Sequence, residues 1–152
     1  GKEKMSNKLV KPRNTGNVIV IDDGSKIYDI VNKNGKWLGK FEFRPADTNI
    51  IKRYEEVVKF YNSYNVPEGK DLGVEEQNKI EKEVIDKMSY LIGADAEEAF
   101  FTILGAFSPL ASGELFIENV LKSISKVIEQ ELAVRTSKVQ RRVNKYVAKY
   151  HN

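Results

Sequence analysis

Residues 36–61, KWLGKFEFRPADTNIIKRYEEVVKFY, contain the change of hydrophobic period that decides the fold class. Up to Phe43, apolar and aromatic side chains recur at every second position, as they do along one face of a β-strand. After Pro45 they recur at every third or fourth position, which is the pattern of an amphipathic α-helix. A strand is therefore followed closely by a helix, and the sequence predicts an α+β fold.

Two segments before this stretch also predict β-structure. Residues 17–21 are apolar and β-branched, and residues 26–31 combine β-branched and aromatic side chains. Turn residues follow each of them, at 22–25 and at 32–35, and the Asn-Gly pair in the second turn accepts the positive φ angles of a tight hairpin. The sequence therefore predicts an N-terminal three-stranded antiparallel β-meander over residues 17–43.

The rest of the chain predicts a bundle of four to five α-helices. Asp47 or Thr48 is the expected N-cap of the first helix, Gly93 the expected stop of the second, and Asp95 the expected cap of the third. The expected helical segments are residues 44–64, 74–92, 96–107, about 114–136, and a C-terminal stretch within 135–152.

These segments suit a single domain with one core. We expect a flexible arm over residues 1–16 and one α+β domain over 17–152, with a meander at 17–43, a helical body at 44–134 and a basic C-terminal helix at 135–152. The expected core joins aromatic residues of the sheet to apolar residues of the helices: Trp37, Phe41, Phe43, Tyr54, Val58, Phe100, Ile103, Leu104, Val120 and Ile124.

The net charge of +3 hides an uneven distribution along the chain. Residues 44–134 carry ten basic and seventeen acidic groups, a net charge of −7, whereas residues 135–152 carry six basic groups and no acidic one. An acidic body with a basic end indicates a charged partner surface more clearly than the net charge of the whole chain does.

The basic end is the strongest candidate for a binding element. Its cationic residues lie beside an apolar stripe that includes Val143 and Val147, and we consider three interpretations: an ordinary solvated helix face, a docking element for an acidic protein surface such as a second copy of this chain, and a nucleic-acid site. Nucleic acid is the least favoured, because the acidic body would repel phosphates. The basic candidates are Arg135, Lys138, Arg141, Arg142, Lys145 and Lys149.

A second candidate binding element is the break around Ser108-Pro-Leu110 between two apolar helices. It reads either as a plain helix connection or as an exposed apolar lip, formed by Phe107 and Leu110, that contacts a partner.

Catalytic chemistry finds no support in the sequence. The chain has no cysteine and one histidine, His151, which excludes thiolate zinc sites and a Ser-His-Asp triad. Asp22-Asp-Gly24 lacks the further oxygen ligands of a calcium loop, and no glycine spacing matches a phosphate-binding loop. No apolar run is long enough to span a membrane. We therefore expect a non-enzymatic protein without a cofactor, a metal or a membrane anchor.

Three strings resemble a known family. Residues 41–56 (FEFRPADTNIIKRYEE), 107–120 (FSPLASGELFIENV) and 145–151 (KYVAKYH) are similar to small proteins from the tail gene clusters of long-tailed bacteriophages and prophages of Gram-positive bacteria, and the layout resembles their tail assembly chaperones. The resemblance covers most of residues 26–151 in layout and assigns no binding residue.

The resemblance implies a morphogenesis factor that works in the host cytoplasm. Its partners would be the tape measure protein, a long helical rod, and the tail tube protein, and such factors are commonly absent from the finished particle. Two alternatives remain open: a structural subunit of the virion, such as a tail-completion or connector protein, and a nucleic-acid-binding regulator that uses residues 135–151.

The charge asymmetry predicts self-association. Opposite charges guide the encounter between copies, and the apolar stripe of residues 135–152 supplies affinity. We expect an oligomer in sedimentation that weakens as salt shortens the Debye length below about 8 Å. Deletion of residues 135–152 should give a folded, smaller species, and a monomer at low salt would contradict the idea.

Overall fold

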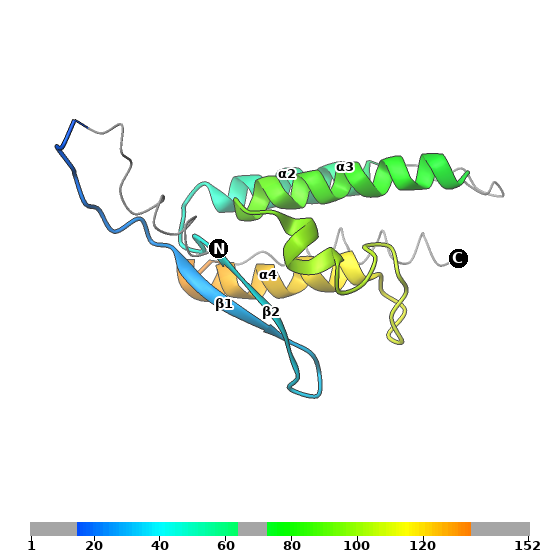
Figure 1. Ribbon diagram of the computed structural model, residues 1–152. Helices are drawn as coiled ribbons and strands as arrows, with labels where there is room; N and C mark the ends of the chain where they lie inside the picture. Colours follow the sequence, from blue (N-terminus) through cyan, green and yellow to red (C-terminus); the bar gives the residue numbers. More distant parts are fainter. Residues whose placement is uncertain (1–14, 64–72, 135–152) are drawn as a thin grey trace.

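The structure is a computed structural model that describes residues 15–63 and 73–134, and its first regular element is a β-hairpin (Figure 1). A two-stranded antiparallel sheet is followed by helices, so the expected α+β class is confirmed. The described elements are β1 (Lys26–Val31), β2 (Trp37–Phe43), α2 (Ile50–Asn62), α3 (Val74–Ile92), the π-helical turn η1 (Glu97–Phe101) and α4 (Phe116–Leu132).

The expected inner position of Trp37 is wrong, because a β-bulge shifts the register at the far end of the hairpin. Ile30 pairs with Gly39, but Val31 pairs with Trp37, so Leu38 is the extra residue. The bulge moves Trp37 to the outer face, where it is 56% exposed and its indole Nε1 donates to Asp29 Oδ1 at 2.9 Å.

The third strand of the expected meander does not form within the described residues. Residues 17–21 pair with no strand, and Ile19 and Val20 are 90% and 89% exposed. The chain turns away at Asp23, whose backbone oxygen accepts a hydrogen bond from Arg44 Nε at 3.1 Å and whose carboxylate pairs with the same guanidinium. The expected hairpin turn at 22–25 therefore acts as a corner that directs the preceding segment outward.

The turn between β1 and β2 forms where expected but with a different geometry. Gly35 has a φ of 83°, whereas Asn34 keeps a negative φ. The Asn32 side-chain oxygen accepts hydrogen bonds from the backbone N–H groups of Asn34 and Lys36, and Asn32 N donates to Lys36 O at 2.9 Å. The side chain of Asn32 thus supports a longer loop, which requires the left-handed conformation at one residue only.

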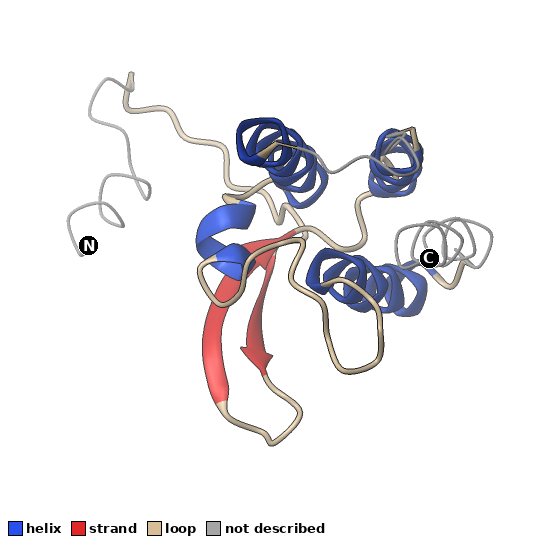
Figure 2. Cartoon of the chain, turned by 90° about the vertical axis from the view of Figure 1, so that its right-hand side faces the viewer, coloured by secondary structure: helices blue, strands red, loops and turns tan. Residues whose placement is uncertain are grey.

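The helices α2, α3 and α4 enclose most of the core (Figure 2). Helix α3 has the expected bounds and ends at Gly93 in the left-handed conformation (φ 66°), as predicted. Asp95 Oδ1 accepts a hydrogen bond from Glu98 N at 3.1 Å, so the expected cap is also present. The N-cap of α2 is Asn49, and neither Asp47 nor Thr48 occupies that position, although Asp47 Oδ1 accepts a hydrogen bond from Asn49 N at 2.9 Å.

The third expected helix, 96–107, is much shorter in the structure. Only the π-helical turn η1 forms, and Thr102 N donates to Glu97 O five residues earlier. The following carbonyl groups have other partners: Ala106 O accepts from Ile117 N at 2.9 Å and Ser108 O from Phe116 N at 2.8 Å. These two carbonyls accept hydrogen bonds from N–H groups in the first turn of α4, which have no partner within their own helix. Because the carbonyls are used in this way, the helix that begins at η1 does not continue through residues 106–108.

The expected core is largely correct. Six of its ten residues are buried, and Phe41 and Ile103 are half-buried. Trp37 is displaced by the bulge, and Leu104 is 39% exposed because it lies beyond the shortened helix. The buried six are Phe43, Tyr54, Val58, Phe100, Val120 and Ile124.

Two parts of the sequence prediction lie outside the described residues: most of the arm at 1–16 and the basic segment at 135–152. Within the described ranges, no helix combines the length and the apolar character that a membrane span needs.

Phe100 tests whether the sheet and the helices share one core. The side chain is 8% exposed, and its ring meets Phe41 edge to face. We expect Phe100→Ala to lower the free energy of unfolding in urea by about 3 kcal/mol, because the substitution removes the ring from both partners. Leu104→Ala, at a partly exposed neighbouring position, is the control and should cost clearly less. Equal effects of the two substitutions would show that Phe100 is not part of a shared core.

Candidate functional site

An apolar groove lies between the hairpin and α4, with a volume of about 730 Å³. One wall is the inner face of the hairpin, and the other is the exposed side of α4 together with residues 110–116. Residues of η1 and the segment after it, including Phe100 and Leu104, lie between the walls. The residues that define the walls are Tyr28, Ile30, Leu38, Leu110, Phe116 and Val127.

A run of aromatic rings links the two walls. Phe41 stacks on Phe43 with 5.0 Å between ring centroids, and Phe41 meets Phe100 edge to face, also at 5.0 Å. Phe101 then contacts Phe116 at the start of α4 at 5.9 Å. Edge-to-face and offset pairs are the favoured geometries of aromatic rings, so this run fixes the spacing of the walls.

Polar contacts hold β1 and α4 together at the root of the hairpin. The Lys26 ammonium pairs with the Glu131 carboxylate near the end of α4, and the Tyr28 hydroxyl donates to the same carboxylate at 3.3 Å. The Lys26 hydrogen bond is the main reason that the pKa of Glu131 lies below its ordinary value. The hairpin is therefore attached at its root, and its tip extends past α4 (Figure 1).

Glu114 lies at the end of the groove where α4 begins. Partial burial opposes its ionisation, but hydrogen bonds from Lys122 Nζ at 2.7 Å and Asn119 Nδ2 at 2.8 Å bring its pKa below the ordinary value. This carboxylate is thus charged and already paired at neutral pH, so it contributes polarity to the groove without a free charge.

The first turn of α4 depends on a buried carboxyl group. Glu118 is fully buried, and its Oε1 accepts a hydrogen bond from Leu115 N at 2.6 Å. Burial raises the pKa of Glu118 to about 7, although this backbone hydrogen bond and the nearby Tyr61 hydroxyl act in the opposite direction. The carboxyl of Glu118 in the folded protein is therefore mostly neutral below pH 7 and loses its proton as the pH rises above that value.

The structure separates the two residues of the expected apolar lip. Leu110 lines the groove, whereas Phe107 does not: it packs against the core, and its backbone N–H donates to Glu81 Oε2 at 3.4 Å on the other side of η1. The six basic candidates, Arg135, Lys138, Arg141, Arg142, Lys145 and Lys149, lie outside the described residues.

The sequence prediction missed the groove because it assigned its residues to a closed core. Phe41, Ile103 and Leu104 line the groove but were expected in the core, and the structure leaves Phe41 and Ile103 half-buried and Leu104 exposed. One signal was available: a small sheet with an aromatic face needs a further element to cover it. Of the two predicted binding residues that the structure describes, Leu110 belongs to the groove and Phe107 does not.

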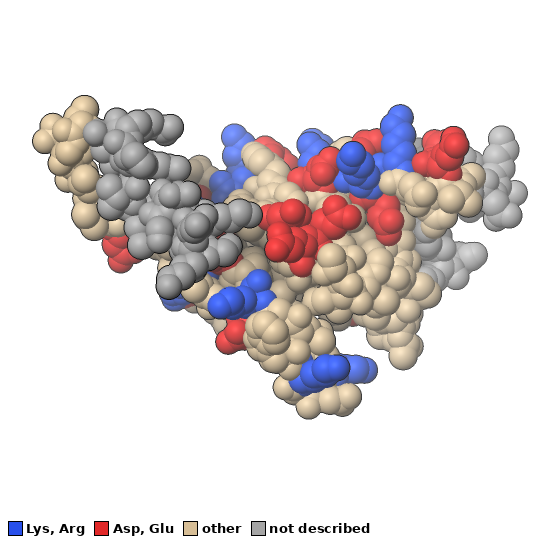
Figure 3. Space-filling model, viewed as in Figure 1, with Lys and Arg blue, Asp and Glu red and all other residues tan. Residues whose placement is uncertain are grey.

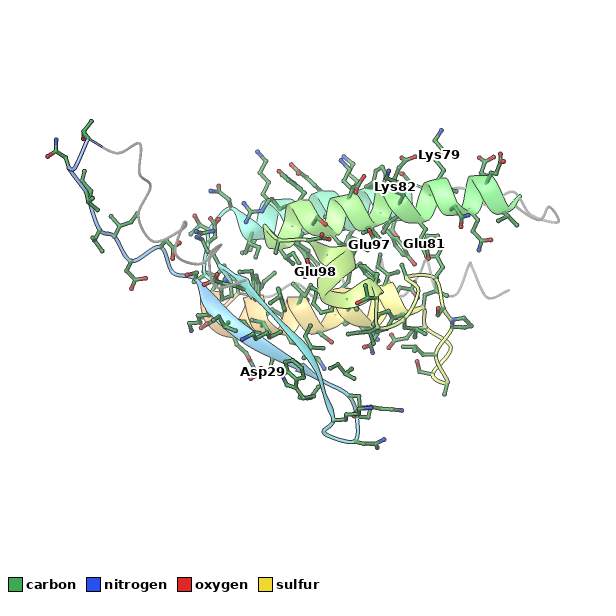
Figure 4. The ribbon with its side chains drawn as sticks, viewed as in Figure 1. Asp29, Lys79, Glu81, Lys82, Glu97 and Glu98 are labelled. Atoms are coloured by element: carbon green, nitrogen blue, oxygen red, sulfur yellow. The ribbon has the colours of Figure 1, made fainter. Side chains whose placement is uncertain are left out.

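Acidic side chains gather on the opposite side of η1, between this turn and α3 (Figure 3). Glu97 and Glu98 lie on η1 and Glu81 on the side of α3 that faces it, whereas Lys79 and Lys82 point away from the body (Figure 4). In the described part of the chain, no three acidic or histidine side chains converge in a way that would hold a metal ion.

The groove is suited to holding an apolar ligand surface. Its apolar residues are mostly half-buried and lie inside, while Asp29, Lys33 and Asn119 are exposed at its rim. An apolar interior with a polar rim is the usual composition of a protein-binding surface. No family model, no curated protein and no solved structure matches this chain significantly.

Glu118 gives the fold a pH dependence of defined sign. Its pKa is about 7 in the folded protein and 4.5 in an unfolded chain, so its stabilising contribution is complete below pH 4.5 and disappears as the pH rises through 7. The difference corresponds to about 3 kcal/mol. We expect Glu118→Gln to remove this decline, because the neutral amide keeps an acceptor for Leu115 N.

Thermal melts across this pH range measure the effect. Glu114→Gln is the control, since the pKa of Glu114 is lowered and its stabilising contribution is lost only as the pH falls below the ordinary carboxyl range. If Glu118→Gln and the natural chain lose stability equally between pH 4.5 and 8, the buried carboxyl is not the cause.

Proposed function

We propose that this protein is a non-enzymatic binding protein of bacteriophage tail morphogenesis, and that the groove between the hairpin and α4 holds its partner. The observation that supports the binding role is the groove itself: an apolar concavity of about 730 Å³ whose walls are formed by side chains of a hairpin and a helix. The assignment to tail morphogenesis rests on the resemblance of residues 41–56, 107–120 and 145–151. The partners are the tape measure protein and the tail tube protein, and the protein acts in the cytoplasm of the host bacterium.

An amphipathic helix is the ligand that best fits the groove. Such a helix inserts its apolar stripe into a hydrophobic groove and leaves its polar face in water. The half-buried Ile30, Leu38 and Val127 supply apolar contacts inside, and the exposed Lys33 and Asn119 supply polar contacts at the rim. A long helical rod such as the tape measure protein offers this kind of stripe repeatedly along its length.

The groove favours a protein ligand over a small molecule. A small-molecule site combines an apolar interior with a few polar groups that converge inside it. Here the polar side chains are at the rim, and the most buried carboxylate in the lining, Glu114, is already paired with Lys122 and Asn119. Apolar area and shape would therefore determine the affinity, as expected for a factor that binds and later releases its partner.

A second candidate function is a structural subunit of the virion. The observation that favours it is the exposed apolar segment Val18-Ile-Val-Ile21, which is 59–90% exposed along its length. Such a segment suits permanent contacts between neighbouring subunits. The nucleic-acid interpretation has no comparable support, because it rests on residues 135–151, which lie outside the described residues.

The groove hypothesis predicts a specific loss of binding. Co-expression with the tape measure and tail tube proteins, followed by affinity capture, should recover a complex with the natural chain. Leu104→Asp places a charge in the groove lining at a position that is 39% exposed, so it should reduce capture about tenfold or more while the chain stays folded.

Tyr90→Asp is the matched control, because Tyr90 is a 52% exposed apolar residue on α3 outside the groove. It should leave capture unchanged. Failure to capture either partner with the natural chain would contradict the proposal. Mass spectrometry of purified particles distinguishes the second candidate, since a stoichiometric presence in mature virions indicates a structural subunit.

A further inference from the structure

Residues 17–21 form an extended segment that is rich in β-branched residues but pairs with no strand in the described chain. Val18, Ile19, Val20 and Ile21 are exposed, and the segment points away from the body (Figures 1 and 2). Within the described residues, their backbone N–H and C=O groups have no hydrogen-bond partner. A run of four β-branched residues in water is unusual for a soluble protein, since such residues favour the interior of a sheet.

The corner at Asp23 holds this segment away from its own sheet. Two aspartate side chains each accept a backbone hydrogen bond two residues later: Asp22 from Gly24 N at 2.9 Å and Asp23 from Ser25 N at 3.0 Å. The hydrogen bonds from Ser25, followed by the Arg44 contact, lower the pKa of Asp23 to about 2, so its charge persists at neutral pH. The direction of the segment is thus set by contacts at its base.

The sheet of the same chain has an unpaired edge that matches the segment. β1 pairs with β2 on one side, and no described strand lies on its other side. Both faces of β1 carry apolar residues: Tyr28 and Ile30 lie on the inner face, and Ile27 and Val31, which are 64% and 56% exposed, lie on either side of Asp29 on the outer face. A strand added beside β1 would therefore need apolar residues at consecutive positions, as residues 18–21 provide.

We propose that residues 17–21 of one copy add as a third strand to the β1 edge of a second copy of this chain. Each copy offers one unpaired segment and an open β1 edge, so a two-fold exchange pairs both of them with the second copy. The exchange gives each sheet the three strands that independent stability normally requires. It also covers Ile27 and Val31 on the outer face, which the isolated chain leaves in water.

A proline scan across residues 18–21 tests the strand pairing. Along an added strand, alternate N–H groups point toward the partner edge, so proline should weaken the dimer about tenfold or more at every second position and clearly less between them. Dimer dissociation is measured by sedimentation. Thr15→Pro, outside the segment, is the control, and unchanged circular dichroism shows that the body stays folded.

Engineered thiols test the exchange between copies, since the natural chain has no cysteine. A chain with Ile19→Cys is mixed with a second chain that carries Ile27→Cys, Asp29→Cys or Val31→Cys. A disulfide should form between the two chains with one of these partners, and that partner identifies the register of the added strand. The corresponding double variants should crosslink as dimers. A monomer at every salt concentration, or crosslinks only within single chains, would overturn the proposal.

Salt and partner binding separate this inference from the other hypotheses. Strand exchange relies on backbone hydrogen bonds and apolar contacts, so high salt should leave the dimer intact, whereas association through the charges of residues 135–152 should weaken. A dimer that dissociates in high salt would therefore contradict strand exchange. The proline variant that dissociates the dimer should still capture the tape measure protein if the groove alone binds it.

Discussion

The contact between Phe41 and Phe100 is the interaction on which the rest of the structure depends. A two-stranded sheet is marginally stable in water by itself, and here the hairpin carries aromatic residues that need a cover. Phe100, presented by the π-helical turn, meets Phe41 edge to face at 5.0 Å and joins the hairpin to the helices. Phe43, which is 3% exposed, adds a second buried contact between the hairpin and the core, whereas the exposed Lys26–Glu131 pair at the root contributes little.

The same contact explains why a groove exists at all. Phe100 contacts the hairpin at Phe41. The tip of the hairpin extends beyond η1 and α4, where no described helix packs against it (Figure 1). Residues 105–115 then lead to the first turn of α4, where the carbonyls of Ala106 and Ser108 and the Glu118 carboxyl satisfy the N–H groups. The loop is thereby held as the second wall, so the concavity is built into the backbone hydrogen bonding and does not depend on a ligand.

The sequence predicted best those features that local chemistry controls. Helix α3 follows from its period, Gly93 ends it because glycine accepts the left-handed conformation, and Asp95 caps the next turn. The errors arose where distant contacts decide. The bulge that turns Trp37 outward depends on pairing across the hairpin, and the shortened third helix depends on α4, which uses the carbonyls of residues 106 and 108. The groove was missed for the same reason, since half-buried and fully buried residues share one spacing.

The described chain leaves two kinds of apolar surface in contact with water, and they differ in physical character. The groove is concave, its walls are held by aromatic contacts and backbone hydrogen bonds, and its rim is polar. The segment at residues 17–21 is extended, and from Val18 to Ile21 its backbone groups have no hydrogen-bond partner within the described residues. A concave apolar surface recognises the shape of a partner, whereas an unpaired strand recognises an open sheet edge with little regard to side-chain identity. Each copy carries both an unpaired segment and an open β1 edge, so the segment of one copy can pair with the edge of another. The groove then remains free to bind a different protein.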